Sequence, residues 1–203
     1  TISMTSHKID TLIFDVDGTL WDTSEIVAGS WTRAVQENSE LGFSYTAEYL
    51  RDKAFGKPMD EIARILLPGV PEDEIKRISR LCFEYEDRDV REKPAHIYEG
   101  LKPALIKLTE LGCKLYIVSN CQLGYIDACK SQCDIDGLIL DELCYGDTGA
   151  PKGVTIKMLM ERNDIEPSEA LYIGDTKGDQ EASAYAGIRF VHAAYGFGSV
   201  EAP

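Results

Sequence analysis

The stretch IFDVDGTL, residues 13–20, places two carboxylates two residues apart, directly after an apolar run. Like charges held this close repel each other, and ionised carboxylates are costly to bury, so chain stability gives no reason for the pair. The residues alone leave two interpretations open. Either the segment is an ordinary polar turn, or Asp15 and Asp17 hold something cationic.

The same apolar run is one of several that predict an α/β fold. Buried parallel strands are predicted at residues 11–14, 114–118 and 170–173, with weaker candidates at 138–140 and 189–191. Helical patterns lie between them at residues 100–111, 123–132, 152–163 and 179–186. Strands that alternate with helices in this way favour a Rossmann-like parallel sheet with helices on both faces.

Residues 22–95 have a different pattern, without a convincing strand. They show helical periodicity at residues 24–38, 47–55, 59–66 and 72–91, separated by loops that contain Gly and Pro. We therefore expect two domains, an α/β core of residues 1–21 and 96–203 and an inserted α-helical cap domain of residues 22–95. The chain would cross between them near residues 21–23 and 94–96.

The charge balance limits the classes of partner. The 203 residues carry a net charge of −14, from 21 Lys and Arg against 35 Asp and Glu. A broad nucleic-acid or anionic-membrane surface needs clustered cations, so both partners are disfavoured, whereas a small anionic substrate needs only one cationic pocket. The N-terminal sequence TISMTSHK has no apolar stretch, and the expected location is the cytoplasm.

Six cysteines are scattered through apolar segments of a chain too large to need disulfide staples. Cys129 and Cys133 share a helical face, but no second Cys or His pair completes a zinc site. Reduced thiols in the core are favoured, with disulfides or a metal as the alternatives.

The polar turns that follow the predicted strands are expected to meet at the carboxyl edge of the sheet, where such sheets bind ligands. They supply four carboxylates, one ammonium and two small polar groups, from Asp15, Asp17, Ser119, Asn120, Lys152, Asp175 and Asp179. Four acids need a compensating cation, and hard oxygen ligands suit Mg²⁺. A phosphoryl group could then be held by the metal, Lys152, Ser119 and backbone N–H groups. Each piece alone is a weak signal, and the specificity lies in their combination and order.

These residues resemble the four motifs of the haloacid dehalogenase superfamily of phosphohydrolases, in the branch with an α-helical cap inserted after the first motif. The motifs are DVDGT at residues 15–19, Ser119 in YIVSN, Lys152 in APKG and GDTKGD at residues 174–179. The resemblance spans residues 9–198. Within the superfamily, CYGDTGAPKG, YIGDTKGD and AAYGFG are most similar to the phosphoglycolate-phosphatase type, which does not fix the substrate.

The resemblance implies a role for each motif residue in a Mg²⁺-dependent phosphatase. Asp15 would be the nucleophile and a metal ligand, and Asp17 the general acid and then base, with its backbone carbonyl on the metal. Asp175 would be the third protein ligand, and Asp179 would order the metal's surroundings or, in addition, Lys152. The phosphate oxygens would be held by Ser119, Asn120 and Lys152.

The predicted cap domain would select the substrate, a small phosphorylated metabolite. In AFGKPMDE, Gly56 and Lys57 lie at a helix–helix junction that members of the family often direct into the site. Lys57 either contacts a substrate carboxylate or phosphate or is an ordinary solvated lysine. Weaker candidates are Trp31, which is more typical of a core residue, and Arg33, whereas His96 is expected to be structural.

Two other functions stay open. A phosphomutase of the β-phosphoglucomutase kind would use the same two aspartates, but such mutases tend to have a histidine where this chain has Val27. A non-catalytic binding module could use the same scaffold, although it could lose the acids and Lys152 without penalty. The oligomeric state is not indicated by the sequence.

Overall fold

The computed structural model describes residues 8–201, so the prediction made from the sequence of residues 1–7 falls outside the described part of the chain. None of the helices within that part is long and apolar enough to cross a membrane. The core is a five-stranded parallel sheet in the order β5-β4-β1-β6-β7. Its strands are β1 (Thr11–Phe14), β4 (Lys114–Ser119), β5 (Ile139–Cys144), β6 (Ala170–Gly174) and β7 (Arg189–His192).

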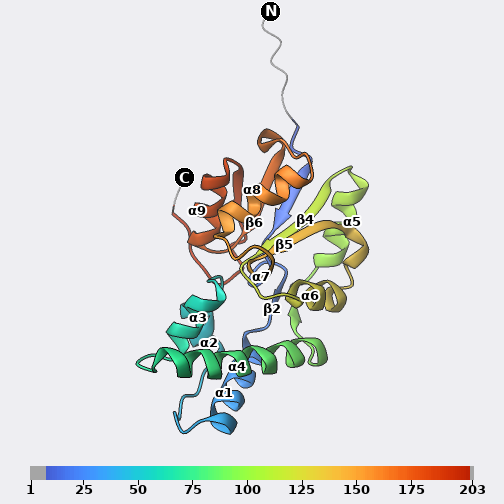
Figure 1. Cartoon of the computed structure of the whole chain (residues 1–203). Coiled ribbons are helices and arrows are strands. Elements are labelled where there is room, and N and C mark those ends of the chain that lie inside the picture. The colour runs from blue at the N-terminus through green and yellow to red at the C-terminus, as the bar shows by residue number, and fades with distance from the viewer. Residues whose placement is uncertain (1–7, 202–203) are drawn as a thin grey trace, which may run out of the picture.

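Side chains of the central strands alternate between two apolar clusters, one on each face of the sheet. On β1, Leu12 and Phe14 join one cluster and Ile13 joins the other. The first face is covered by α5 (Leu101–Glu110) and α6 (Tyr125–Cys133), and the second by α8 (Lys152–Arg162) and α9 (Lys177–Ala186). The predicted α/β class, a parallel sheet with helices on both faces, is confirmed (Figure 1).

Four further helices, α1–α4, form a layer of their own beside the sheet. Figure 1 shows them gathered at one end of the sheet, with the long α4 crossing beneath it. They are α1 (Ser24–Asn38), α2 (Ala47–Lys53), α3 (Met59–Leu66) and α4 (Glu72–Glu92). Two antiparallel two-residue strands, β2 (Trp21–Asp22) and β3 (His96–Ile97), flank the layer where the chain leaves and re-enters the core. These short strands are absent from the sequence-based prediction, because two residues are too few to show a period.

Short elements complete the described chain. They are the helix α7 (Tyr145–Thr148) and the 3₁₀ turns η1 (Asp136–Leu138) and η2 (Pro167–Glu169). The six cysteines are free thiols, and five of them are buried. The Sγ atoms of Cys129 and Cys133 lie 3.9 Å apart on one face of α6, as their spacing predicts.

Candidate active site

Asp15 lies at the carboxyl end of the central strand, where it is 2% exposed. Its backbone N–H donates to the carbonyl of Ile173 at 2.9 Å, which extends the ladder between β1 and β6 by one residue. One carboxylate oxygen, Oδ1, lies 3.2 Å from Nζ of Lys152. The other, Oδ2, is buried and has no hydrogen-bond partner among the described residues. Buried acceptors normally have partners, so this oxygen indicates a missing ligand.

Asp15, Asp175 and Asp179 form a buried acidic triad in which one oxygen from each lies within 4.8 Å of the others. Burial, followed by the carboxylate of Asp179, raises the pKa of Asp15 well above its ordinary value, although Lys152 opposes the shift. Burial also raises the pKa of Asp175, despite a backbone donor that lowers it. The triad therefore holds more negative charge than Lys152 alone offsets, and a divalent cation would supply the difference.

Lys152 begins α8 directly after Pro151 and points into the triad. Its Nζ donates to Oδ1 of Asp179 at 2.6 Å, and its side chain is 5% exposed. Burial would lower the pKa of this ammonium, but Asp15 and Asp179 raise it above its ordinary value. The lysine is therefore a fixed positive charge rather than a proton donor.

Asp179 is held by the turn that opens α9. Its Oδ2 accepts hydrogen bonds from the backbone N–H groups of Asp175 and Thr176, both at 3.1 Å, and from the Thr176 hydroxyl at 3.0 Å. The Thr176 hydroxyl in turn accepts from the backbone N–H of Asp179, which completes a capping box. A Cβ at Gly174 would lie 2.5 Å from Oδ2 of Asp179, so this approach requires glycine. Burial opposes the ionised form, yet Lys152 and the donors of Thr176 lower the pKa of Asp179.

Asp175 is enclosed by two glycine-containing segments from opposite ends of the chain. Its Oδ2 accepts from the backbone N–H of Phe197 at 2.8 Å, and the Thr19 hydroxyl donates to Oδ1 at 3.4 Å. A Cβ at Gly18 would lie 2.1 Å from Oδ2, and one at Gly196 would lie 2.3 Å from Asp175 Cβ. Gly18 also has a φ of +79°, which other residues rarely adopt. Both glycines thus let Asp175 approach the turn after β1.

The carboxylate of Asp17 does not join the triad. Its Oδ1 accepts from the hydroxyl of Tyr125 at 2.7 Å, the indole N–H of Trp21 at 3.1 Å and the hydroxyl of Thr23 at 3.4 Å. All three donors reach the same oxygen, which leaves Oδ2 for another partner. Burial is the largest effect and raises the pKa of Asp17 to about 7, although the hydrogen bond from Tyr125 lowers this pKa.

Ser119 and Asn120 stand at the carboxyl end of β4 and line one cavity together with Asp15 and Asp17. The side-chain N–H₂ of Asn120 donates to the carbonyl of Gly56 at 2.9 Å, a contact that joins the sheet edge to the segment between α2 and α3. The rings of Phe55 and Phe197 pack across the same junction with centroids 5.4 Å apart. The segment between α2 and α3 therefore contacts the carboxyl edge of the sheet beside the cavity that Asp15 lines.

The remaining candidates from the sequence fall in different places. Lys57 borders the cavity, but its Nζ lies 3.9 Å from Glu61 and its side chain is 43% exposed. Trp31 is 1% exposed and lines the cavity, so it is both a core residue and part of the site. Arg33 pairs with Asp89 at 2.9 Å, and His96 lies in β3; neither borders the cavity.

Several side chains at the site give no signal in the sequence. Tyr125 fixes Asp17 from 108 positions further along the chain, so only the fold brings the two residues together. Phe197 contributes a backbone N–H, which any residue could supply. Glu86 reaches the cavity from a charged helix, where its neighbours suggest a solvated face.

The donor set of the triad suits a hard divalent cation. Three buried carboxylates with oxygens close together, one of them unpartnered among the described residues, are the ligand type that Mg²⁺ prefers. Soft ligands are absent from this group, which consists of aspartates alone. The residues therefore fit the metal predicted from the sequence.

The acidic triad and Lys152 thus lie at the carboxyl edge of a parallel sheet, where folds of this kind bind their ligands. A family model described as haloacid dehalogenase-like hydrolase matches residues 12–193. The chain belongs to this family, and the resemblance predicted from four motifs is confirmed.

Similar proteins agree with this membership. The chain is 30% identical over 203 residues to a phosphoglycolate phosphatase of Vibrio vulnificus, an alignment that covers 96% of this chain and 87% of that protein. A crystal structure described as a predicted phosphoglycolate phosphatase from Haemophilus somnus matches with a TM-score of 0.84 and 21% identity, over 97% of this chain and 89% of that one. A haloacid dehalogenase-like hydrolase from Streptococcus pneumoniae matches with a TM-score of 0.81 and 25% identity, at the same two coverages of 97% and 89%. The expected enzyme class, a phosphoric monoester hydrolase, is the class of the named relatives.

Proposed function

We propose that this protein is a Mg²⁺-dependent phosphatase that hydrolyses a small phosphorylated metabolite through an aspartyl-phosphate on Asp15. One observation carries the proposal: Asp15 ends the central strand with one oxygen against Lys152 and the other buried without a partner among the described residues. The residue also faces the cavity that Ser119 and Asn120 line. A carboxylate fixed in this way is oriented for attack on a phosphorus atom placed in that cavity.

In the first step, an oxygen of Asp15 bonds to phosphorus and the bond from phosphorus to the ester oxygen breaks. The leaving oxygen takes a proton from Oδ2 of Asp17, the oxygen that Tyr125, Trp21 and Thr23 leave free. In the second step, water attacks the phosphorus of the aspartyl-phosphate and Asp17 takes a proton back. Phosphate is released, and Asp15 is again a carboxylate.

The phosphate itself is a dianion, and a carboxylate attacks it only where cations offset their repulsion. Lys152 is one such cation and is held beside Asp15 by Asp179. Bound Mg²⁺ would supply further positive charge, held by Asp15, Asp175 and the backbone carbonyl of Asp17. Both oxygens of Asp179 are already engaged, so we assign this residue to positioning Lys152 next to the metal site.

We infer that residues 22–95 act as a cap domain over a catalytic core of residues 1–21 and 96–203. The contacts of Gly56 with Asn120 and of Phe55 with Phe197 support a closed position. Closure would keep bulk water away from the phosphoryl group, and opening would admit the ester. We expect Gly56 to shape the phosphate end of the cavity and Lys57 to line its outer rim.

Phosphate release from a panel of esters tests the proposed function. The panel runs from p-nitrophenyl phosphate to two-carbon phosphates, each assayed with Mg²⁺ and with excess chelator. We expect turnover with Mg²⁺ and its loss with chelator, because the triad alone is too negative to receive a dianion. Equal turnover in both conditions, or none for any ester, would contradict the proposal.

The mutase alternative has a separate readout. Val27 is buried and lines the cavity, so the position that tends to be histidine in such mutases offers no proton carrier here. Incubation with β-glucose 1-phosphate is expected to give no glucose 6-phosphate. Formation of glucose 6-phosphate without phosphate release would favour the mutase instead.

A further inference from the structure

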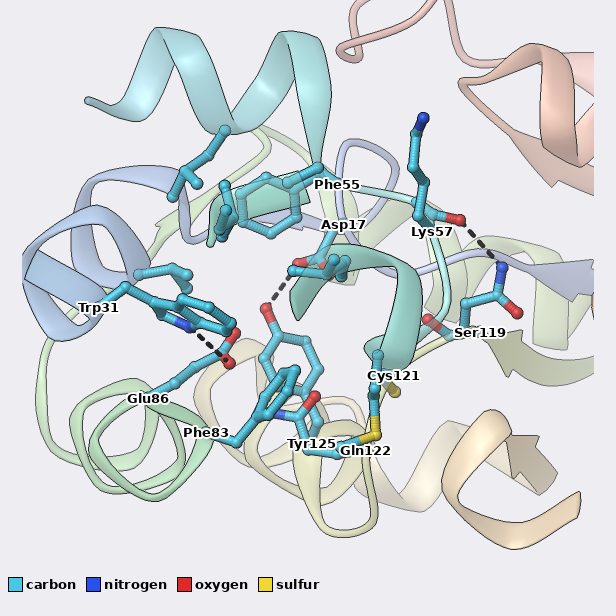
Figure 2. A pocket seen from close by; sticks show the side chains of 18 of the residues that line it. Asp17, Trp31, Phe55, Lys57, Phe83, Glu86, Ser119, Cys121, Gln122 and Tyr125 are labelled. Carbon is cyan, nitrogen blue, oxygen red and sulfur yellow. Dashed lines mark hydrogen bonds between the residues drawn. The ribbon is translucent and has the colours of Figure 1, made fainter. Parts of the chain in front are cut away.

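The cavity above the acidic triad is walled mainly by apolar side chains of the α1–α4 layer. It encloses about 40 Å³, which is room for a few heavy atoms. Its apolar wall includes Val27, Trp31, Phe55, Ile62, Leu66 and Phe83. In Figure 2, Trp31 and Phe83 stand on either side of Glu86, and Phe55 lies across the cavity from them. Because the phosphate would lie at Asp15, this wall surrounds the leaving group.

Glu86 is the one acid that the α1–α4 layer contributes to the cavity among the described residues. It comes from the middle of α4 and is 6% exposed. Its Oε2 accepts from the indole N–H of Trp31 at 3.4 Å, as the dashed line in Figure 2 shows. A carboxyl group directed into an apolar cavity is a strong determinant of what can enter, since it accepts hydrogen bonds and, once ionised, repels anions.

The surroundings of Glu86 contain acids and neutral groups. Burial is the largest effect and raises the pKa of Glu86 to about 8, with further increases from Asp87 and Asp17. The N–H donors of Trp31 and Gln122 offset this increase in pKa only in part. The phenol of Tyr125 and the thiol of Cys82 also face it, and both are neutral at ordinary pH because burial raises their pKa values.

The cationic groups of the layer do not balance Glu86. Lys57 is the one cation among the described residues that border the cavity. In Figure 2 its ammonium extends away from Glu86 and Tyr125, and its Nζ lies 3.9 Å from Glu61 outside. Arg33 and Arg51 are paired with Asp89 and Asp22. A leaving group that carries its own negative charge would therefore meet an apolar wall and another acid.

We propose that this cavity selects phosphate esters of small, uncharged alcohols that bear a further hydroxyl, and discriminates against esters whose leaving group carries a carboxylate. This inference rests on the proposed function. The hydroxyl would donate to Glu86 while the carbon atoms contact Trp31 and Phe83. A carboxylate, as in 2-phosphoglycolate, would be desolvated beside Glu86 without a cation to offset it.

Two nearly isosteric esters test the inference, 2-hydroxyethyl phosphate and 2-phosphoglycolate. The measurement is the ratio of the two kcat/KM values with Mg²⁺ at about pH 9, above the pKa of about 8 of Glu86, so that its carboxylate is ionised. Ionisation of Asp17, whose pKa is about 7, lowers both kcat/KM values alike and cancels in this ratio. We expect about 100-fold preference for 2-hydroxyethyl phosphate. Equal use of the two esters, or a preference for 2-phosphoglycolate, would overturn the inference.

Two variants separate the effect of Glu86 from that of the apolar wall. In Glu86→Gln the preference is expected to fall about tenfold, because an amide accepts from Trp31 and also donates to a carboxylate. Glu84→Gln, on the same helix but 57% exposed, is the matched control and should keep the wild-type preference. An unchanged preference in Glu86→Gln would contradict the assignment.

The result also distinguishes the two proposals. If p-nitrophenyl phosphate is hydrolysed with Mg²⁺ while 2-phosphoglycolate is preferred over its neutral partner, only the inference about the leaving group fails. The same holds if neither small ester is used. If no phosphate ester is hydrolysed, the proposed function fails, and the inference fails with it.

Discussion

Replacing Asp15 with Asn is expected to lower Mg²⁺-dependent phosphate release by about 10⁴-fold or more. Asparagine has nearly the same shape, but its amide is not a nucleophile and cannot form the aspartyl-phosphate. It also removes one negative charge from the triad with Asp175 and Asp179. Since Asp179 still pairs with Lys152, the metal-free variant should unfold at a temperature no lower than the wild type.

Asp10→Asn is the matched control for this variant. Asp10 lies just before the amino end of the same strand and accepts a hydrogen bond from the Thr11 hydroxyl at 2.9 Å. An amide oxygen can keep that bond, so both activity and unfolding temperature should stay close to the wild type. Asp15→Asn with activity near that of Asp10→Asn would show that Asp15 is not the nucleophile.

Replacing Lys152 with Met is expected to destabilise the metal-free protein by about 3–5 kcal/mol, the usual cost of removing one partner from a buried ion pair. Methionine fills much of the same space, but it leaves Asp15 and Asp179 buried without their cation. Phosphate release should also fall by about 10²–10³-fold, because one cation that would contact the phosphate is lost. Denaturant unfolding and steady-state kinetics measure the two effects.

Lys177→Met is the control for a lysine at a helix start. Lys177 begins α9 and is 57% exposed, with ion pairs to Glu181 and Glu201 at the surface. Such pairs contribute little, and the stability should change by less than about 1 kcal/mol. Mg²⁺ should recover part of the stability lost in Lys152→Met, since it would bind Asp15, one of the two acids that lose their cation. A Lys152→Met protein as stable as Lys177→Met would contradict the charge balance described for the triad.

The sequence predicts much of the fold because the apolar pattern and the residues typical of helix ends indicate the same element bounds. Strand β1 and helices α1 and α3 have the predicted bounds, since glycines and prolines lie in the loops around them. Strand β5 is longer than its apolar run indicates. Its additional residues include Asp141, which pairs with Arg162, and Glu142, which pairs with Lys130. An edge strand can carry such charged side chains, which form ion pairs beside the sheet. Because they interrupt the apolar run, hydrophobicity alone predicts a shorter strand.

The candidate site could be predicted in part, because the acids and Lys152 lie at strand ends and helix starts. The topology then brings Asp15, Asp175 and Asp179 together without information from long-range contacts. The orientation of Asp17 could not be predicted, because it depends on Tyr125, a residue of α6. Glu86 could not be predicted either, since the burial of one charged residue on a charged helix depends on what packs against it.

The most direct test of the proposed mechanism is to trap the phosphoryl group on the enzyme. Wild-type protein is mixed with Mg²⁺ and the most rapidly hydrolysed ester, quenched in acid within one turnover, and digested for mass spectrometry. We predict the mass of one phosphoryl group on Asp15, sensitive to hydroxylamine and absent from Asp15→Asn. Turnover with no label on the protein, or with the label on another residue, would contradict the proposed mechanism.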